Sequence, residues 1–167
     1  MKSFKDKFAS IYGIDDENYD MEDLIVNNTS VELEKGSDTL KYLLFDFSRE
    51  TSPGRYEKIF KAIKLVKIKR IPKKDLAITS FLDMQAGVVT GYYQNQINFL
   101  QIWANIVKPE RIGLIFAYGV QGVSAVSIED AKRQADIQMA GLMRGITGTF
   151  RTLEYTYLSS EEASWII

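Results

Sequence analysis

A strand, a glycine pair and a capped helix follow one another in the C-terminal half of this chain, and they restrict its fold more than any other segment. Residues 111–118 are mostly apolar or aromatic, which is typical of a strand that is partly buried on both faces. Gly119 and Gly122 come next. Ser127 and Asp130 stand at the spacing of a capping box, which indicates the start of a helix. The sequence therefore predicts a buried strand, a glycine turn and a helix in direct succession.

The helix that begins after Ser127 has an apolar face. Small and apolar residues recur along it at spacings of three and four, and they predict the side that packs on a sheet: Ile128, Ala131, Ala135, Met139, Leu142 and Ile146. A strand is expected over residues 149–158. Ser159 and Glu162 then repeat the capping-box spacing, and the chain stops within the first turn of this last helix. We therefore expect the chain to be the N-terminal fragment of a longer protein.

Hydrophobic periodicity predicts three amphipathic helices upstream of this segment. Apolar residues recur at helical spacing over residues 3–12, 56–63 and 96–107. Residues 39–47 are apolar and short, and they fit either a buried strand or a helical turn. A break follows at residues 48–54, which contain a Pro-Gly pair.

Two further patterns predict strands. Apolar residues alternate with basic ones from residue 65 to residue 70, which suits a strand with a basic outer face. Residues 76–84 and 88–93 are strand-like runs joined by three residues that end in Gly87, so we expect a hairpin with a bulged turn.

The order of predicted elements from residue 76 onward indicates the fold class. Strands and helices alternate there, which predicts an α+β fold: a mixed β-sheet covered by helices on one face, with ferredoxin-like elements. We assign residues 54–167 to this domain. Residues 1–53 carry twelve acidic and six basic residues, and we expect them to form an acidic N-terminal arm with a short helix.

The residue types that are missing limit the chemistry of the chain. It has no histidine and no cysteine, so it lacks a histidine general base, a Ser-His-Asp triad, a cysteine nucleophile and the usual ligands of zinc. There is also no run of about 18 apolar residues, and charged residues occupy the place of a signal peptide's apolar core. We expect a cytoplasmic, non-catalytic chain without a cofactor.

The segment formed by residues 55–74 is strongly basic. It holds nine basic residues and one acidic residue. Such a segment favours salt-sensitive contact with nucleic acid or with an anionic membrane surface, and the residues expected to make it are Lys67, Lys69, Arg70, Lys73 and Lys74. The alternative is a solvated surface that pairs with acidic residues of this chain or of a partner.

The glycine segment over residues 119–124 has two interpretations. Backbone amides near Gly119 and Gly122 can bind phosphate next to a helix N-terminus, so the segment is a candidate loop for a phosphate or nucleotide, together with Gln121 and Ser124. It lacks the Gly-Lys-Ser/Thr sequence of a P-loop, however. The simpler interpretation is a turn where a core strand meets a core helix.

Two weaker patterns also have both a structural and a functional interpretation. The aromatic residues of the C-terminal half are expected in the core and at the rim of the sheet rather than in a ligand cage. Carboxylate-based hydrolysis would require acidic side chains to converge in one cleft, and the candidates are Asp83, Glu110, Glu129, Asp130 and Glu154. Their spacing gives no sign that they do.

Three blocks of the sequence resemble one protein family. They are Gly113-Leu-Ile-Phe-Ala-Tyr-Gly-Val-Gln-Gly122, Gly148-Thr-Phe-Arg-Thr-Leu-Glu-Tyr155 and Leu158-Ser-Ser-Glu-Glu-Ala163. With the helix between the first two, they resemble the N-terminal domain of pumping ATPases of the HerA type, the motors related to conjugative DNA transfer and type IV secretion. The resemblance covers the chain from about residue 76 and leaves the first seventy residues unassigned.

The resemblance implies a function without implying a catalytic site here. In that family an α+β domain precedes the ATPase, so a P-loop is expected beyond Ile167. The chain would then be an assembly domain of an oligomeric motor, at the inner face of the membrane, with protein partners from the transfer machine. The alternative function is a domain that binds a phosphate or nucleotide through residues 119–124.

Overall fold

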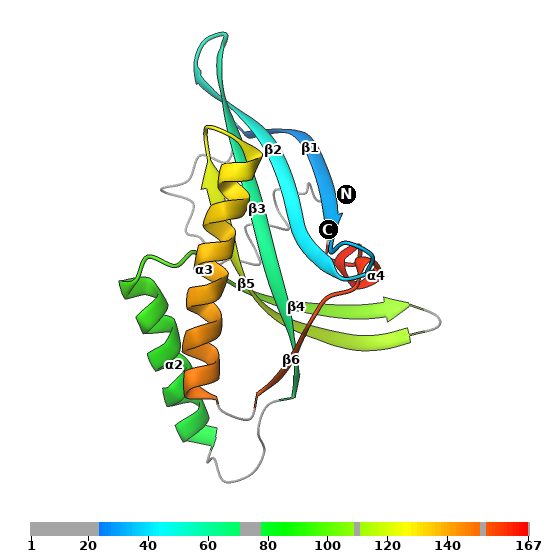
Figure 1. The fold of residues 1–167 in the computed structure, drawn as a ribbon, viewed down its shortest axis with the longest axis vertical. Coiled ribbons are helices and arrows are strands. Elements are labelled where there is room, and N and C mark those ends of the chain that lie inside the picture. Colours follow the sequence, from blue (N-terminus) through cyan, green and yellow to red (C-terminus); the bar gives the residue numbers. More distant parts are fainter. Residues whose placement is uncertain (1–23, 71–77, 109–110, 151–152, 167) are drawn as a thin grey trace.

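The computed structural model describes residues 24–70, 78–108, 111–150 and 153–166, and it has the α+β fold that the sequence predicts (Figure 1). Its elements, in chain order, are β1 (Leu24–Leu33), β2 (Leu40–Ser52), β3 (Arg55–Arg70), α2 (Ile78–Gln94), β4 (Phe99–Lys108), β5 (Arg111–Ser124), α3 (Ile128–Thr149), β6 (Glu154–Tyr157) and α4 (Ser160–Ala163). The helix expected over residues 3–12 lies outside the described residues.

Six strands form one sheet in the order β1-β2-β3-β5-β4, and β6 also pairs with β3. All the described pairings are antiparallel, so the expectation of a mixed sheet is wrong. Strand β2 pairs with β3 as far as Ile63, which lies opposite Leu43. From Val66 onward, β6 pairs with β3 instead. A hydrogen bond from Leu40 N to Leu158 O, 2.8 Å long, joins β2 to the residue after β6.

The predicted division between residues 53 and 54 is also wrong. That position is the turn of a hairpin in which β2 pairs with β3 along most of its length. Gly54 has a φ of 76°, a left-handed conformation that glycine adopts without strain. Residues 24–53 therefore belong to the same sheet as the rest of the chain.

Helices cover the two faces of the sheet unequally. Helix α3 packs on β3 and β5, and α2 lies beside α3 (Figure 1) and also contacts β4. We call this side the helix face, and its core consists of Tyr42, Ala62, Val66, Ile68, Tyr92, Tyr118, Val120, Ala131, Ala135, Met139, Leu142, Ile146 and Phe150. The second face has a smaller core next to α4, which consists of Leu40, Leu43, Leu65, Ile115, Ala117, Leu158 and Ala163.

The features predicted around α3 are confirmed. Ser127 is the N-cap of the helix, and its side chain accepts a hydrogen bond from Asp130 N. Every residue of the predicted stripe from Ala131 to Ile146 is buried against the sheet. Ser159 and Glu162 form the predicted capping box of α4.

Three elements were assigned to the wrong class. Residues 56–63, expected to be helical, are part of strand β3. Residues 76–93 were expected to form a hairpin, but they are helical from Ile78 onward and belong to α2. Residues 96–107 were expected to form a helix, but most of them belong to strand β4. In β3, Ala62 packs against α3 while Ile63 packs on the second face. A strand that is apolar on both faces shows no clean alternation, and its apolar residues can match a helical spacing.

Candidate interaction surfaces

The segment over residues 119–124 is the C-terminal part of strand β5 and not a loop. A Cβ atom at Gly122 would overlap the carbonyl oxygen of Ala131 in α3, and a Cβ atom at Gly119 would overlap the side chain of Leu65. The glycines therefore let the helix and the neighbouring side chain approach the strand closely. The prediction of a glycine turn or ligand loop at this place is wrong in its local structure.

The other two residues of that segment also have structural contacts. The backbone amide of Gln121 donates to Asn98 O at 3.2 Å. The hydroxyl of Ser124 is buried and accepts a hydrogen bond from Val126 N at 3.0 Å. Both residues thus connect β5 to its neighbours in the chain and in the sheet.

Carboxylates of the chain occupy the N-terminal end of α3. Asp130 binds Arg133 and Gln134 through its side chain. The hydrogen bond from Arg133, followed by those from Ser124 and Gln134, holds the pKa of Asp130 below its ordinary value. Glu129 pairs with Lys132 at 2.8 Å. These carboxylates place negative charge at the N-terminal end of α3, which disfavours a bound phosphate there.

The structure distributes the cations of the basic segment over both faces of β3. On the helix face, Lys64 forms an ion pair with Asp136 at 2.7 Å. On the second face, Lys61 lies 5.2 Å from the centre of the Phe47 ring, and burial lowers its pKa. The predicted contact residue Lys69 is exposed, whereas Lys73 and Lys74 lie outside the described residues.

Lys67 has an internal partner that the sequence did not indicate. Its ammonium group pairs with the Glu162 carboxylate, and both side chains are mostly shielded from solvent. The second carboxylate oxygen of Glu162 accepts a hydrogen bond from Ser159 N at 3.1 Å, which completes the capping box. The same glutamate thus caps α4 and ties it to β3, so Lys67 is a structural residue of the second face.

A second polar cluster fixes α3 to the sheet through Tyr42. The buried Tyr42 hydroxyl donates to Asp136 at 2.8 Å, and Lys64 binds the other oxygen of that carboxylate. Burial raises the pKa of Asp136, but the hydrogen bonds from Lys64 and Tyr42 outweigh it, so the net shift is downward. Lys132 of α3 reaches Glu32 of β1 at 2.6 Å and extends this connection to the edge of the sheet.

The candidate carboxylates for hydrolysis lie on separate elements. Asp83 is on α2, Glu129 and Asp130 begin α3, and Glu154 begins β6. Glu110 falls outside the described residues. Within the described part of the chain, no group of three or more Asp, Glu, His or Cys side chains is arranged to hold a metal ion.

Most of the aromatic residues lie in the core or on strands of the sheet, as predicted, but Tyr93 is an exposed residue of helix α2. Tyr92, Tyr118 and Phe150 are buried, and Tyr93, Trp103, Tyr155 and Tyr157 are exposed. Trp103 of β4 stacks on Phe116 of β5, with 4.2 Å between the ring centres.

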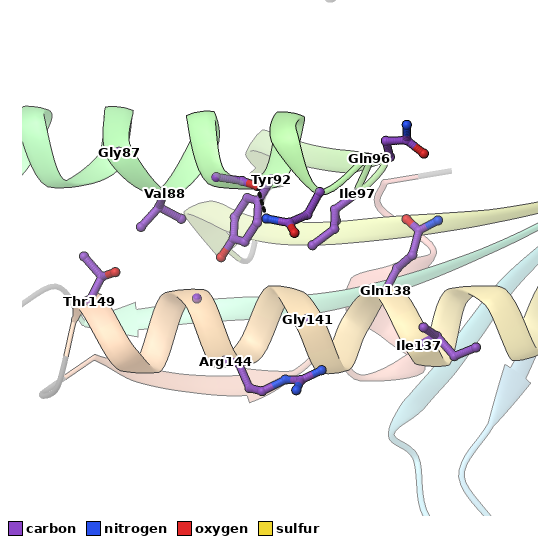
Figure 2. A pocket seen from close by; sticks show the side chains of 13 residues that line it. Gly87, Val88, Tyr92, Gln96, Ile97, Ile137, Gln138, Gly141, Arg144 and Thr149 are labelled. Carbon is purple, nitrogen blue, oxygen red and sulfur yellow. Dashed lines mark hydrogen bonds between the residues drawn. The ribbon is translucent and has the colours of Figure 1, made fainter.

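A groove of about 810 Å³ runs between α2 and α3 (Figure 2). Its walls include Val88 and Tyr92 of α2, Ile97 of the following loop, and Ile137 and Arg144 of α3. The Tyr92 hydroxyl crosses to α3 and donates to Leu142 O at 2.8 Å. None of the residues that line the groove is acidic, and none belongs to the sites predicted from the sequence.

The outer edge of β1 is exposed and largely apolar. Four large aliphatic residues of this strand are exposed: Ile25, Val26, Val31 and Leu33. Its single charged residue, Glu32, is bound to Lys132 and Lys41. Within the described part of the chain this edge pairs with no other strand, and an exposed strand edge of this kind is a site for pairing with another strand. This strand was not predicted from the sequence, although the apolar residues at its two ends are a signal for it.

Comparisons of the chain with protein-family models, with curated proteins and with solved structures found no match. In the described residues, no helix is both long enough and apolar enough to cross a membrane.

Proposed function

We propose that this chain is a non-catalytic interaction domain that serves in the assembly of a motor ATPase for conjugative DNA transfer or type IV secretion. The observation that carries the interaction role is the outer edge of β1, which has four exposed aliphatic residues and pairs with no other strand among the described residues. Such an edge is suited to strand addition by a protein partner. The motor assignment rests on the resemblance of the sequence blocks to the HerA-type family.

The structural roles of one block support this proposal. In the block over residues 158–163, Leu158 and Ala163 are fully buried, and Glu162 caps α4 and binds Lys67. These residues hold α4 on the sheet. The resemblance in this block therefore concerns residues that stabilise the fold and not residues of a catalytic site, as expected for an assembly domain.

The coding sequence that follows Ile167 tests the motor assignment. A P-loop of the Gly-Lys-Ser/Thr type in the same reading frame is expected, because that family carries its nucleotide site after this domain. A stop codon at or near Ile167, or a long continuation without a P-loop, would contradict the assignment.

A contact with nucleic acid or an anionic membrane surface is a subsidiary proposal. The exposed Lys69 forms no ion pair with another described residue. The remaining basic residues of the segment follow it in the sequence: Arg70, Lys73 and Lys74. Such a contact would be weak and salt-dependent. Lys67 is best left out of it, since its charge is already matched by Glu162.

A further inference from the structure

The side-chain directions along β1 follow from its pairing with β2. Val26 lies opposite Phe47, Thr29 opposite Phe45 and Val31 opposite Leu43, and residues directly opposite each other in an antiparallel pair share a face. Since Leu43 belongs to the core of the second face, Val26, Thr29 and Val31 are all on that face.

The remaining residues of the strand point to the helix face. Asn28 lies opposite Asp46, Ser30 opposite Leu44 and Glu32 opposite Tyr42, whose ring is buried against α3. Asn27 is an extra residue between Val26 and Asn28, a β-bulge whose side chain binds Asp46 and Ser48. Val26 and Val31 are an odd number of positions apart, so they would point to opposite faces of a regular strand. The bulge brings them to the same face.

This pattern makes β1 complementary to itself. If two copies of the strand run antiparallel about a two-fold axis at Thr29, and each bulged Asn27 is passed over, residues that share a face meet each other. Thr29 then lies opposite Thr29 of the second copy, Asn28 opposite Ser30, and Val26 opposite Val31. Thr–Thr and β-branched pairs are among the favourable cross-strand pairs.

Charge placement favours the same register. The next pair outward joins Ile25 to Glu32, so the single carboxylate of each strand avoids the carboxylate of the other. Like charges directly opposite each other would destabilise the pairing. Glu32 also keeps its own counter-ions, Lys132 and Lys41, on the helix face.

We propose that the partner of the β1 edge is a second copy of this chain, joined by antiparallel β1–β1 pairing about a two-fold axis at Thr29. The two sheets then form one continuous sheet through the dimer. This inference rests on the proposed interaction function, and it identifies the partner of that surface. A closed two-fold contact of this kind uses the same patch on both copies.

A cysteine placed on the proposed axis tests the register. The chain contains no cysteine, so Thr29→Cys introduces a single thiol. Mild oxidation should convert most of this variant to a covalent dimer, because Cβ atoms of opposite residues lie close enough for a disulfide. The matched control is Ala125→Cys, which places an exposed thiol in the turn before α3. Equal cross-linking of the two variants would overturn the proposal.

Lysine substitutions at the edge test the pairing without oxidation. Val26→Lys should weaken dimerisation in sedimentation equilibrium by about ten-fold or more, because two charges enter the interface. Val126→Lys is the control, since Val126 is 82% exposed and lies away from β1. Both positions are exposed, so circular dichroism should show an unchanged fold.

Two results would overturn the inference: a chain that stays monomeric up to about 0.5 mM, or a dimer that Val26→Lys leaves intact. A dimer that forms only through another surface gives the second result. Neither outcome depends on what the gene encodes after Ile167. The motor assignment and the β1 pairing can therefore be refuted independently of each other.

Discussion

The ammonium group of Lys67 on β3 pairs with the carboxylate of Glu162 on α4, 95 positions later in the chain. Because Glu162 also completes the capping box with Ser159, one carboxylate holds the last helix together and attaches it to the sheet. This contact gives two sequence features a structural role. Lys67, which was expected at a binding surface, stabilises the fold. Its partner, Glu162, belongs to the sequence block over residues 158–163.

Removal of the Glu162 carboxylate should destabilise the fold. In Glu162→Ala the capping box is lost and the mostly shielded ammonium group of Lys67 loses its carboxylate partner, so the free energy of unfolding should fall by about 2–3 kcal/mol. Urea unfolding measures the change. Glu161→Ala, at the exposed neighbouring position, should change it by less than about 0.5 kcal/mol. Equal effects of the two substitutions would show that the pair contributes nothing.

The glycine at position 122 should tolerate no side chain. A Cβ atom there meets the backbone of α3, which cannot move without displacing the helix, so Gly122→Ala should cost about 2 kcal/mol or more. Gly148→Ala is the matched control, because nothing lies within 4 Å of its Cβ position and alanine favours the helix. It should leave stability unchanged or raise it by up to about 1 kcal/mol. A neutral Gly122→Ala would refute the close-packing role.

Acid should weaken the connection between Asp136 and Tyr42. The pKa of Asp136 is lower in the folded chain than its ordinary value of 3.8, so its contribution is present above that value and is lost as the pH falls through the folded pKa. At pH 7, Asp136→Asn should lower the free energy of unfolding by about 1 kcal/mol, a modest figure because the side chain is half exposed.

The difference between wild type and Asp136→Asn should shrink as the pH falls through the lowered pKa of Asp136, because the wild-type carboxylate then also becomes neutral. Unfolding curves at a series of pH values measure it. Asp83→Asn, on the exposed side of α2, serves as the control and should match wild type throughout. A difference that stays constant with pH would contradict the role of the Asp136 charge.

Binding of the basic segment to anions should depend on Lys69 and on the basic residues that follow it in the sequence. Charge reversal of Lys69, Arg70, Lys73 and Lys74 should abolish binding of labelled DNA or of anionic vesicles at low salt, because each phosphate contact releases counterions. Fluorescence anisotropy and vesicle sedimentation distinguish the two ligands. Lys58→Glu, an exposed cation elsewhere on β3, is the control. Binding that survives the fourfold reversal would exclude this segment.

The sequence was most informative where local signals act alone. The cap at Ser127, the stripe from Ala131 to Ile146 and the capping box at Ser159 depend on residues a few positions apart, and all were predicted correctly. The strand predicted over residues 65–70 is confirmed as part of β3, whereas residues 56–63 of β3 and residues of β4 were predicted to be helical because both faces of these strands carry apolar residues, which hides the alternation. Helix α2 was missed because Gly87 and Gly91 interrupt its pattern.

The candidate sites were less predictable, since they depend on contacts between distant segments. Nothing near Lys67 in the sequence indicates Glu162, and nothing near Gly122 indicates that α3 lies against it. The bulge at Asn27 obscures the two apolar ends of β1, and so its exposed edge was not predicted. In each case the tertiary fold decides whether a residue is structural or available to a partner.

The protection of β1 amides against hydrogen exchange tests the account most directly. If a second copy pairs with this edge, amides within Leu24–Leu33 should exchange several-fold more slowly at about 200 µM chain than at about 2 µM. The opposite edge, strand β4, should exchange at the same rate at both concentrations. Exchange in β1 that is independent of concentration would contradict the proposed pairing.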